Sequence, residues 1–69
     1  MKSEEVVLIS AVSATAGAVA HQSGLTTGTA WLDAAIGVGL AAVGWYLDYD
    51  GVGDAVEAFG VGYFLSAVL

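Results

Sequence analysis

The sequence has no cysteine, no proline and almost no positive charge, and these absences exclude several classes of protein. Without cysteine there can be no disulfide, no thiolate metal site and no cysteine nucleophile. Lys2 is the single Lys or Arg against seven Asp and Glu residues, which gives a formal net charge of −6. Binding to nucleic acid needs clustered Lys and Arg that neutralise phosphates, so we expect no nucleic-acid partner.

Charged residues of either sign are scarce, and hydrophobic residues take their place. Only 12% of the 69 residues are charged and 58% are hydrophobic, whereas ordinary soluble domains have about 25% charged residues. The mean hydropathy is +0.82. A soluble domain this small buries only about 60% of its unfolded surface, which is too little to cover so many apolar side chains. The composition therefore predicts a protein of the lipid bilayer or of a tightly packed membrane assembly.

Three long uncharged runs predict a single membrane domain, residues 1–69, of the all-α class. We expect two to three short transmembrane helices that pack through small-residue faces and cross the bilayer up, down and up. The third run is short for a span, so both a spanning and a re-entrant helix stay open, and we favour the span. The expected elements are helices at 3–22, 29–47 and 53–69, a polar loop at 22–28 and an acidic turn at 48–54.

Two other interpretations of the hydrophobic runs fit the residues less well. A membrane-spanning strand alternates apolar and polar residues over about ten positions, and residues 34–43 do not alternate. A cleaved signal peptide has a basic start, whereas Glu4 and Glu5 oppose Lys2, although Ala18-Val19-Ala20 is similar to a cleavage site. We therefore expect the first run to be a helix of the mature protein.

Small residues recur at helical spacing in all three runs. Such stripes let helix backbones approach closely in lipid, where water does not drive association. Glycine costs a helix about 1 kcal/mol relative to alanine, so its repeated use indicates close packing. The expected packing residues are Ser10, Ala14, Gly17, Ala18, Gly37, Ala41, Gly44, Ala58, Gly62 and Ser66.

The expected helix ends carry capping and aromatic residues. Ser3 and Thr29 can serve as N-caps of the first two helices, because their side-chain oxygens can accept hydrogen bonds from the first free amides, and Asp54 is the candidate N-cap of the third. Trp and Tyr collect where a span meets the lipid headgroups. The expected membrane-interface residues are Trp31, Trp45, Tyr46 and Tyr49.

The acidic turn is the strongest candidate for chemistry. Asp48, Asp50 and Asp54 could offer several oxygen ligands to a hard cation. An EF-hand loop is longer and ends in a bidentate Glu, which this turn lacks. We expect a solvated turn, keep the three aspartates as weak cation candidates, and expect no resident metal or cofactor.

Three more ionisable residues bear on function. Asp33 and Glu57 each lie within about a turn of an expected helix start, so we expect both to face water; a central position would favour proton or sodium transport. His21, the single histidine, has no carboxylate near it in the sequence, and no serine, histidine and acid are evidently brought together. We therefore expect no enzyme and no catalytic residue.

The acidic bias, with one lysine and abundant Ala, Val, Gly and Thr, resembles the composition of halophilic proteins. In strong salt the carboxylates keep such proteins hydrated, and the salt screens the repulsion between the carboxylates. The chain is similar to small acidic membrane proteins of halophilic archaea or of their membrane-containing icosahedral viruses. The resemblance implies a host-cell or virion internal membrane. Residues 36–40 also resemble the glycine helix of rotary ATPase proteolipid subunits, but this chain has no arginine loop and Glu57 is not central.

We expect a small non-enzymatic integral membrane protein that acts as a structural subunit of a larger membrane assembly, such as a component that links a virion membrane to its capsid. Its expected partners are the lipid bilayer and other membrane or capsid-type proteins, in a homo- or hetero-oligomer. One alternative is a holin-like pore-forming oligomer, although the usual charged C-terminal tail is missing. A further alternative is an ion-translocating ring subunit, with Glu57 as the ion-handling carboxylate.

Overall fold

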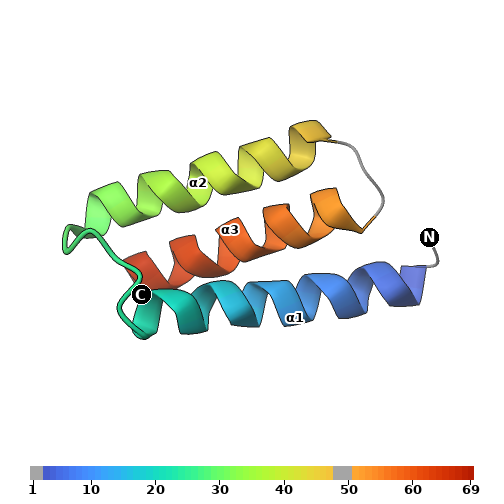
Figure 1. Ribbon diagram of the computed structural model, residues 1–69, viewed down its shortest axis with the longest axis horizontal. Helices are drawn as coiled ribbons and strands as arrows, with labels where there is room; N and C mark the ends of the chain where they lie inside the picture. The colour runs from blue at the N-terminus through green and yellow to red at the C-terminus, as the bar shows by residue number, and fades with distance from the viewer. Residues whose placement is uncertain (1–2, 48–50) are drawn as a thin grey trace.

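The computed structural model describes residues 3–47 and 51–69, which form three helices without any strand in those ranges; the first and third run parallel and the second runs antiparallel to both (Figure 1). The helices are α1 (Ser3–Gln22), α2 (Ala30–Leu47) and α3 (Val52–Val68). Each boundary lies within one residue of the range expected from the sequence. The all-helical part of the predicted fold class is therefore confirmed.

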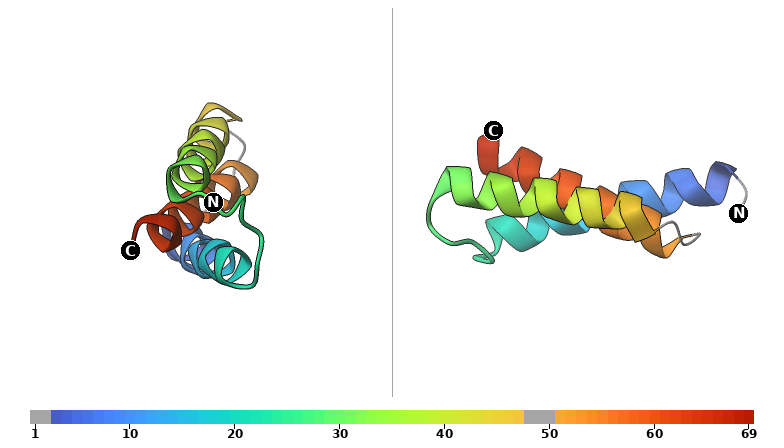
Figure 2. Two further views of the ribbon diagram at one scale, coloured as in Figure 1. Left: turned by 90° about the vertical axis from the view of Figure 1, so that its left-hand side faces the viewer. Right: turned by 90° about the horizontal axis from the view of Figure 1, so that it is seen from above.

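The third helix lies between the other two. α3 packs against both α1 and α2, whereas the backbones of α1 and α2 do not pack against each other (Figures 1 and 2). The starts of α1 and α3 lie at one end of the molecule, and the loop 23–29 and the end of α3 lie at the other. This is the arrangement that helices running up, down and up require. The molecule measures 37 × 20 × 15 Å.

Glycines let the backbone of α3 approach both neighbouring helices. A Cβ atom built on Gly60 would lie 2.5 Å from the amide nitrogen of Ala41 in α2. On the other side of α3, a Cβ atom on Gly62 would lie 2.9 Å from Cα of Ala14 in α1. Both distances are shorter than real Cβ contacts allow, so each position excludes every side chain.

The residues expected to pack between helices fall into three groups. Gly17, Gly37, Gly44 and Gly62 are buried and lie against the backbone of a neighbouring helix. Ala14 and Ala41 provide the backbone that glycines of α3 contact. Ser10, Ala18, Ala58 and Ser66 are half-buried. Two glycines absent from the expected set, Gly53 and Gly60, are also buried.

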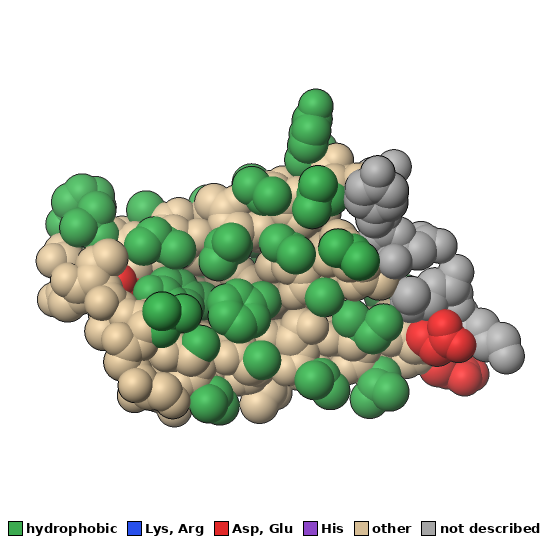
Figure 3. Space-filling model, in the orientation of Figure 1, with side chains coloured by type: hydrophobic (Ala, Val, Ile, Leu, Met, Phe, Trp, Pro, Cys, Tyr) green, Lys and Arg blue, Asp and Glu red, His purple; other side chains and the backbone are tan. Residues whose placement is uncertain are grey.

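The large hydrophobic side chains lie on the outside of the bundle. Among the described residues, Tyr63 is the one hydrophobic side chain counted as buried, while Val7, Leu8 and Val12 are more than half exposed. Figure 3 shows apolar side chains spread over the visible face of all three helices. By length and composition, α1 and α2 are apolar enough to cross a membrane. At 1.5 Å per residue, α3 is about 26 Å long.

The start of α3 differs from the expected one. The helix begins at Val52, directly after Gly51, whose φ of 81° is in the left-handed region that favours glycine. No side chain caps the helix, so the expectation that Asp54 is the N-cap is wrong. Asp54 lies instead in the first turn, where its charge is favourable to the helix dipole.

The expected cation site is only partly within the described structure. Asp48 and Asp50 lie outside the described residues, as does Tyr49. Within residues 3–47 and 51–69, no group of three or more His, Asp or Glu side chains is placed to hold a metal ion.

Candidate functional site

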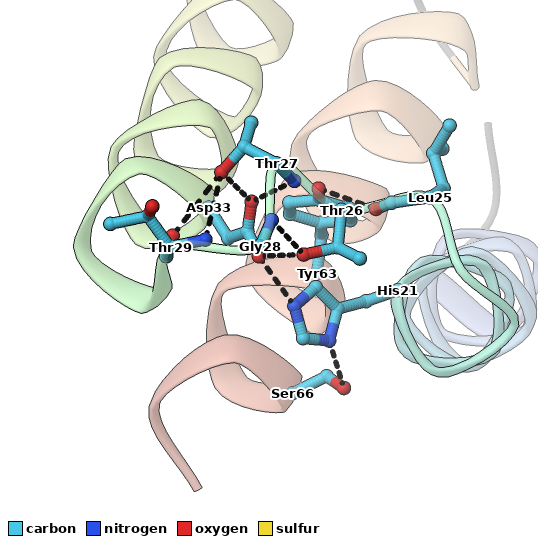
Figure 4. Close-up of polar contacts among 9 residues, drawn as sticks. All are labelled: His21, Leu25, Thr26, Thr27, Gly28, Thr29, Asp33, Tyr63 and Ser66. Carbon is cyan, nitrogen blue, oxygen red and sulfur yellow. Dashed lines mark hydrogen bonds and ion pairs between the residues drawn. The ribbon is translucent and has the colours of Figure 1, made fainter.

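A buried carboxylate is the centre of a set of polar side chains at the loop end of the bundle (Figure 4). Asp33 lies in the first turn of α2 and is only 2% exposed. The expectation that Asp33 faces water is therefore wrong, because the loop 23–29 folds against this turn and provides donors to it. We call its surroundings the polar cluster, which consists of His21, Thr26, Thr27, Asp33, Tyr63 and Ser66.

Four donors surround the carboxylate of Asp33. Its Oδ1 accepts hydrogen bonds from the backbone N–H of Thr27 at 2.8 Å and from the hydroxyl of Thr27 at 2.7 Å. Its Oδ2 accepts hydrogen bonds from the hydroxyl of Thr26 and from Nε2 of His21, the latter at 3.0 Å. Burial of a charge is very costly, and these four donated hydrogen bonds stabilise the ionised carboxylate of Asp33.

The imidazole of His21 connects all three helices. Its Nε2 bonds to Asp33 in α2, and its Nδ1 lies 2.9 Å from Oγ of Ser66 in α3. An ionised carboxylate only accepts hydrogen bonds, so we assign the proton of the neutral ring to Nε2. Nδ1 is then the acceptor for the hydroxyl proton of Ser66. The structure thus joins a histidine to a serine and a carboxylate, so the expectation that no such residues are brought together is wrong.

Tyr63 of α3 supports both the loop and the imidazole. Its hydroxyl donates a hydrogen bond of 2.6 Å to the carbonyl oxygen of Leu25. Its ring meets the ring of His21 edge to face, with centroids 5.0 Å apart and an interplanar angle of 85°. Such aromatic pairs prefer this geometry, because the positive edge of one ring meets the negative face of the other. Tyr63 therefore fixes the ring orientation from which His21 reaches Asp33 and Ser66.

The loop folds into this shape because of its glycines and threonines. Gly24 and Gly28 have φ angles of 112° and 84°, which side-chain-bearing residues rarely adopt. The hydroxyl of Thr26 accepts a hydrogen bond of 3.0 Å from the backbone N–H of Gly28 while it donates to Asp33. These local bonds aim the donors of the loop at the carboxylate.

A groove lies beside the polar cluster, between α1 and α3. It has a volume of about 390 Å³. Its lining includes Ser66, which belongs to the polar cluster, and Gln22, which follows His21 in the sequence. The other lining residues are Ala14, Thr15, Ala18, Gly62, Leu65 and Leu69. The hydroxyl that bonds to His21 therefore belongs to a residue that borders open space.

Glu57, the other ionisable residue singled out in the sequence, is not part of the polar cluster. It is half-buried in the second turn of α3, and its backbone lies against Gly44 of α2. The structure thus brings Asp33 together with His21 and leaves Glu57 toward the opposite end of the bundle.

Comparisons of the chain with protein-family models, with curated proteins and with solved structures gave no match.

Proposed function

We propose that this chain is an integral membrane protein whose three helices cross a bilayer and act as a structural subunit of a larger membrane assembly. The distribution of side chains between the inside and the outside of the bundle carries the proposal. Glycine backbones meet inside the bundle, while Val7, Leu8, Val12 and their neighbours lie exposed. Apolar surface left in water costs about 25 cal/mol per Å², whereas the same surface facing lipid carries no such cost.

The dimensions and the aromatic residues support the same proposal. At 1.5 Å per residue, α1 is about 30 Å long, which equals the hydrocarbon thickness of a typical bilayer. Trp31, at the loop end of α2, is 70% exposed, and Trp45 and Tyr46, at its other end, are 76% and 83% exposed. Aromatic residues at both ends of one helix are typical of a span whose ends lie at the headgroups.

The arrangement of the helices supports a role in assembly. α1 and α2 lie on opposite sides of α3, so each has an outer face that no other described helix covers. In lipid such faces are available to neighbouring subunits, which associate through van der Waals packing rather than through the hydrophobic effect. The acidic composition is that of halophilic proteins, so the proposed location is a membrane or virion of the halophilic type. The proposed partners are other membrane or capsid-type proteins of that assembly.

The proposal is tested by isolating the native membrane or particle and following this chain through it. The chain should stay with the bilayer after an alkaline carbonate wash and should copurify with a large assembly at high salt. Lowering the salt should release it from its partners, because the repulsion of a net charge of −6 is then unscreened. Release of the chain into the soluble fraction by the carbonate wash would contradict membrane integration.

Two measurements separate the alternatives. A holin-like pore former would make liposomes leak small dyes at a low protein-to-lipid ratio, whereas a structural subunit should leave the dyes trapped. An ion-translocating ring subunit would react with a carbodiimide at Glu57 in a manner that depends on sodium or pH.

A further inference from the structure

Ser66, His21 and Asp33 form a continuous row of hydroxyl, imidazole and carboxylate, with one residue from each helix (Figure 4). The two distances, 2.9 Å and 3.0 Å, lie in the range of about 2.6–3.2 Å that joins a nucleophile to its base and the base to its orienting group. We propose that Ser66 is a nucleophilic serine that takes acyl groups from carboxylic esters with an apolar acyl chain.

The protonation states of Asp33 and His21 suit the activation of the Ser66 hydroxyl. Asp33 accepts the Nε2 proton of His21, which leaves the lone pair of Nδ1 directed at the hydroxyl of Ser66. Asp33 is itself held by Thr26 and Thr27, and the ring of His21 is held by Tyr63. His21 is therefore the base, and Asp33 is a positioning residue that acts through it.

The groove beside Ser66 defines the class of substrate. Its volume of about 390 Å³ lies within the range of about 300–1,000 Å³ that is usual for small-molecule sites. Apart from Ser66, Gln22 and Thr15 its lining is apolar, which suits a hydrocarbon chain. The side-chain amide of Gln22 borders the same groove and is of the kind that donates to the oxyanion formed at an attacked carbonyl.

The reaction balances with an ester and water as the reactants. Oγ of Ser66 bonds to the carbonyl carbon while its proton passes to Nδ1 of His21. The ester C–O bond then breaks, and the alcohol leaves with that proton, so that an acyl group remains on Ser66. Water attacks this acyl group, with His21 again as base, and releases the carboxylic acid and the free serine. Gln22, which borders the same groove as Ser66, is exposed at the loop end of the bundle and gives water a route to the acyl group.

This activity is separate from the structural role. If the chain stays in its assembly but Ser66 does not react, only this inference is contradicted. If Ser66 reacts but a carbonate wash releases the chain, only the proposed function is contradicted.

The test uses the full chain in detergent micelles, with an alkyl fluorophosphonate as the probe and peptide mass spectrometry as the readout. The expected result is an adduct on Ser66 that Ser66→Ala abolishes. His21→Gln should slow its formation at least about 100-fold. Ser23→Ala, at an exposed serine of the loop, should leave the rate unchanged. No adduct on Ser66 of the folded wild-type chain would overturn the proposal, as would an unchanged rate in folded His21→Gln.

A pH profile of the wild-type labelling rate keeps the test independent of variants that do not fold. The labelling rate should rise with pH as a single group loses its proton, because neutral His21 is the base. Two other titratable side chains face His21, namely Asp33 from α2 and Tyr63 from α3. A rate without any such step would overturn the assignment of His21. p-Nitrophenyl octanoate, an ester with an apolar chain, should be hydrolysed with the same profile.

Discussion

Gly37 of α2 and Gly60 of α3 face each other reciprocally across the helix contact. A Cβ atom on Gly37 would lie 2.8 Å from the carbonyl oxygen of Gly60, and one on Gly60 would lie 2.6 Å from the carbonyl oxygen of Gly37. Backbone therefore meets backbone at the centre of the bundle, where a soluble protein would place interlocking large side chains. The apolar side chains point outward instead, and this arrangement underlies the proposal that the bundle is embedded in lipid.

Gly44→Ala should destabilise the bundle, because a Cβ atom there would lie 2.7 Å from the carbonyl oxygen of Gly53 in α3. We expect a loss of about 1–3 kcal/mol in the free energy of unfolding, measured by denaturant titration in micelles. Gly39→Ala is the matched control, because no atom of another described helix lies within 4 Å of its Cβ position. It should raise stability by up to about 1 kcal/mol through helix propensity. Equal effects at both positions would contradict the assigned contact face.

Gly62→Ala should separate α1 from α3 without disturbing α2, because the added Cβ would meet the backbone of Ala14. Spin labels on cysteines at Val12 and Val61, and in a second sample at Val43 and Val61, report the two distances. We expect the Val12–Val61 distance to lengthen and the Val43–Val61 distance to stay constant. Equal changes in both would show that the two contacts of α3 are not independent.

Asp33→Asn should loosen the loop 23–29, because its amide group turns a donor toward residues that themselves donate to Asp33. Amide hydrogen exchange at Thr26 and Thr27 should become faster, and the thermal midpoint should fall. Asp54→Asn, which removes the same charge from the first turn of α3, should change the midpoint much less. A loop that exchanges at the wild-type rate in Asp33→Asn would contradict the central role of this carboxylate.

Tyr63→Phe removes only the hydroxyl that donates to the carbonyl of Leu25. The loss of one hydrogen bond corresponds to about a fivefold change in a local opening equilibrium, so exchange of the loop amides should rise by a similar factor. Tyr46→Phe, at a tyrosine that is 83% exposed, should leave the exchange unchanged. The ring contact with His21 should persist in Tyr63→Phe, and the labelling of Ser66 should persist with it.

The helices were predictable from the sequence because charge and loop residues punctuate it sharply. Residues 6–20 contain no charge, and Gly24 and Gly28 mark the turn. Gly62 also lies on a stripe that the sequence predicts for α3, whereas Gly53 and Gly60 lie off that stripe. A helix between two others needs two packing faces, and one stripe at intervals of four residues describes only one of them.

The sequence does not predict the polar cluster directly, because its members are far apart along the chain. His21 and Asp33 are 12 residues apart, and His21 and Ser66 are 45 apart. The predicted order of helices, up, down and up, nevertheless places the end of the first, the start of the second and the end of the third at the same end of the bundle. That topology was the signal that could have brought the three residues together.

The central claim, that the outward apolar side chains face lipid, is tested most directly by labelling single cysteines in sealed vesicles with a membrane-impermeant maleimide. The native chain has no cysteine, so Val12→Cys, Ser23→Cys and Val52→Cys each report one place. Val12 is 62% exposed in the middle of α1. Val52, which is 58% exposed, is used in place of the neighbouring Gly51, because the φ of 81° at Gly51 would make a cysteine there strained. The account predicts that Ser23→Cys and Val52→Cys are labelled from opposite faces of the vesicle and that Val12→Cys is labelled from neither. Labelling of Val12→Cys as fast as Ser23→Cys would contradict the account.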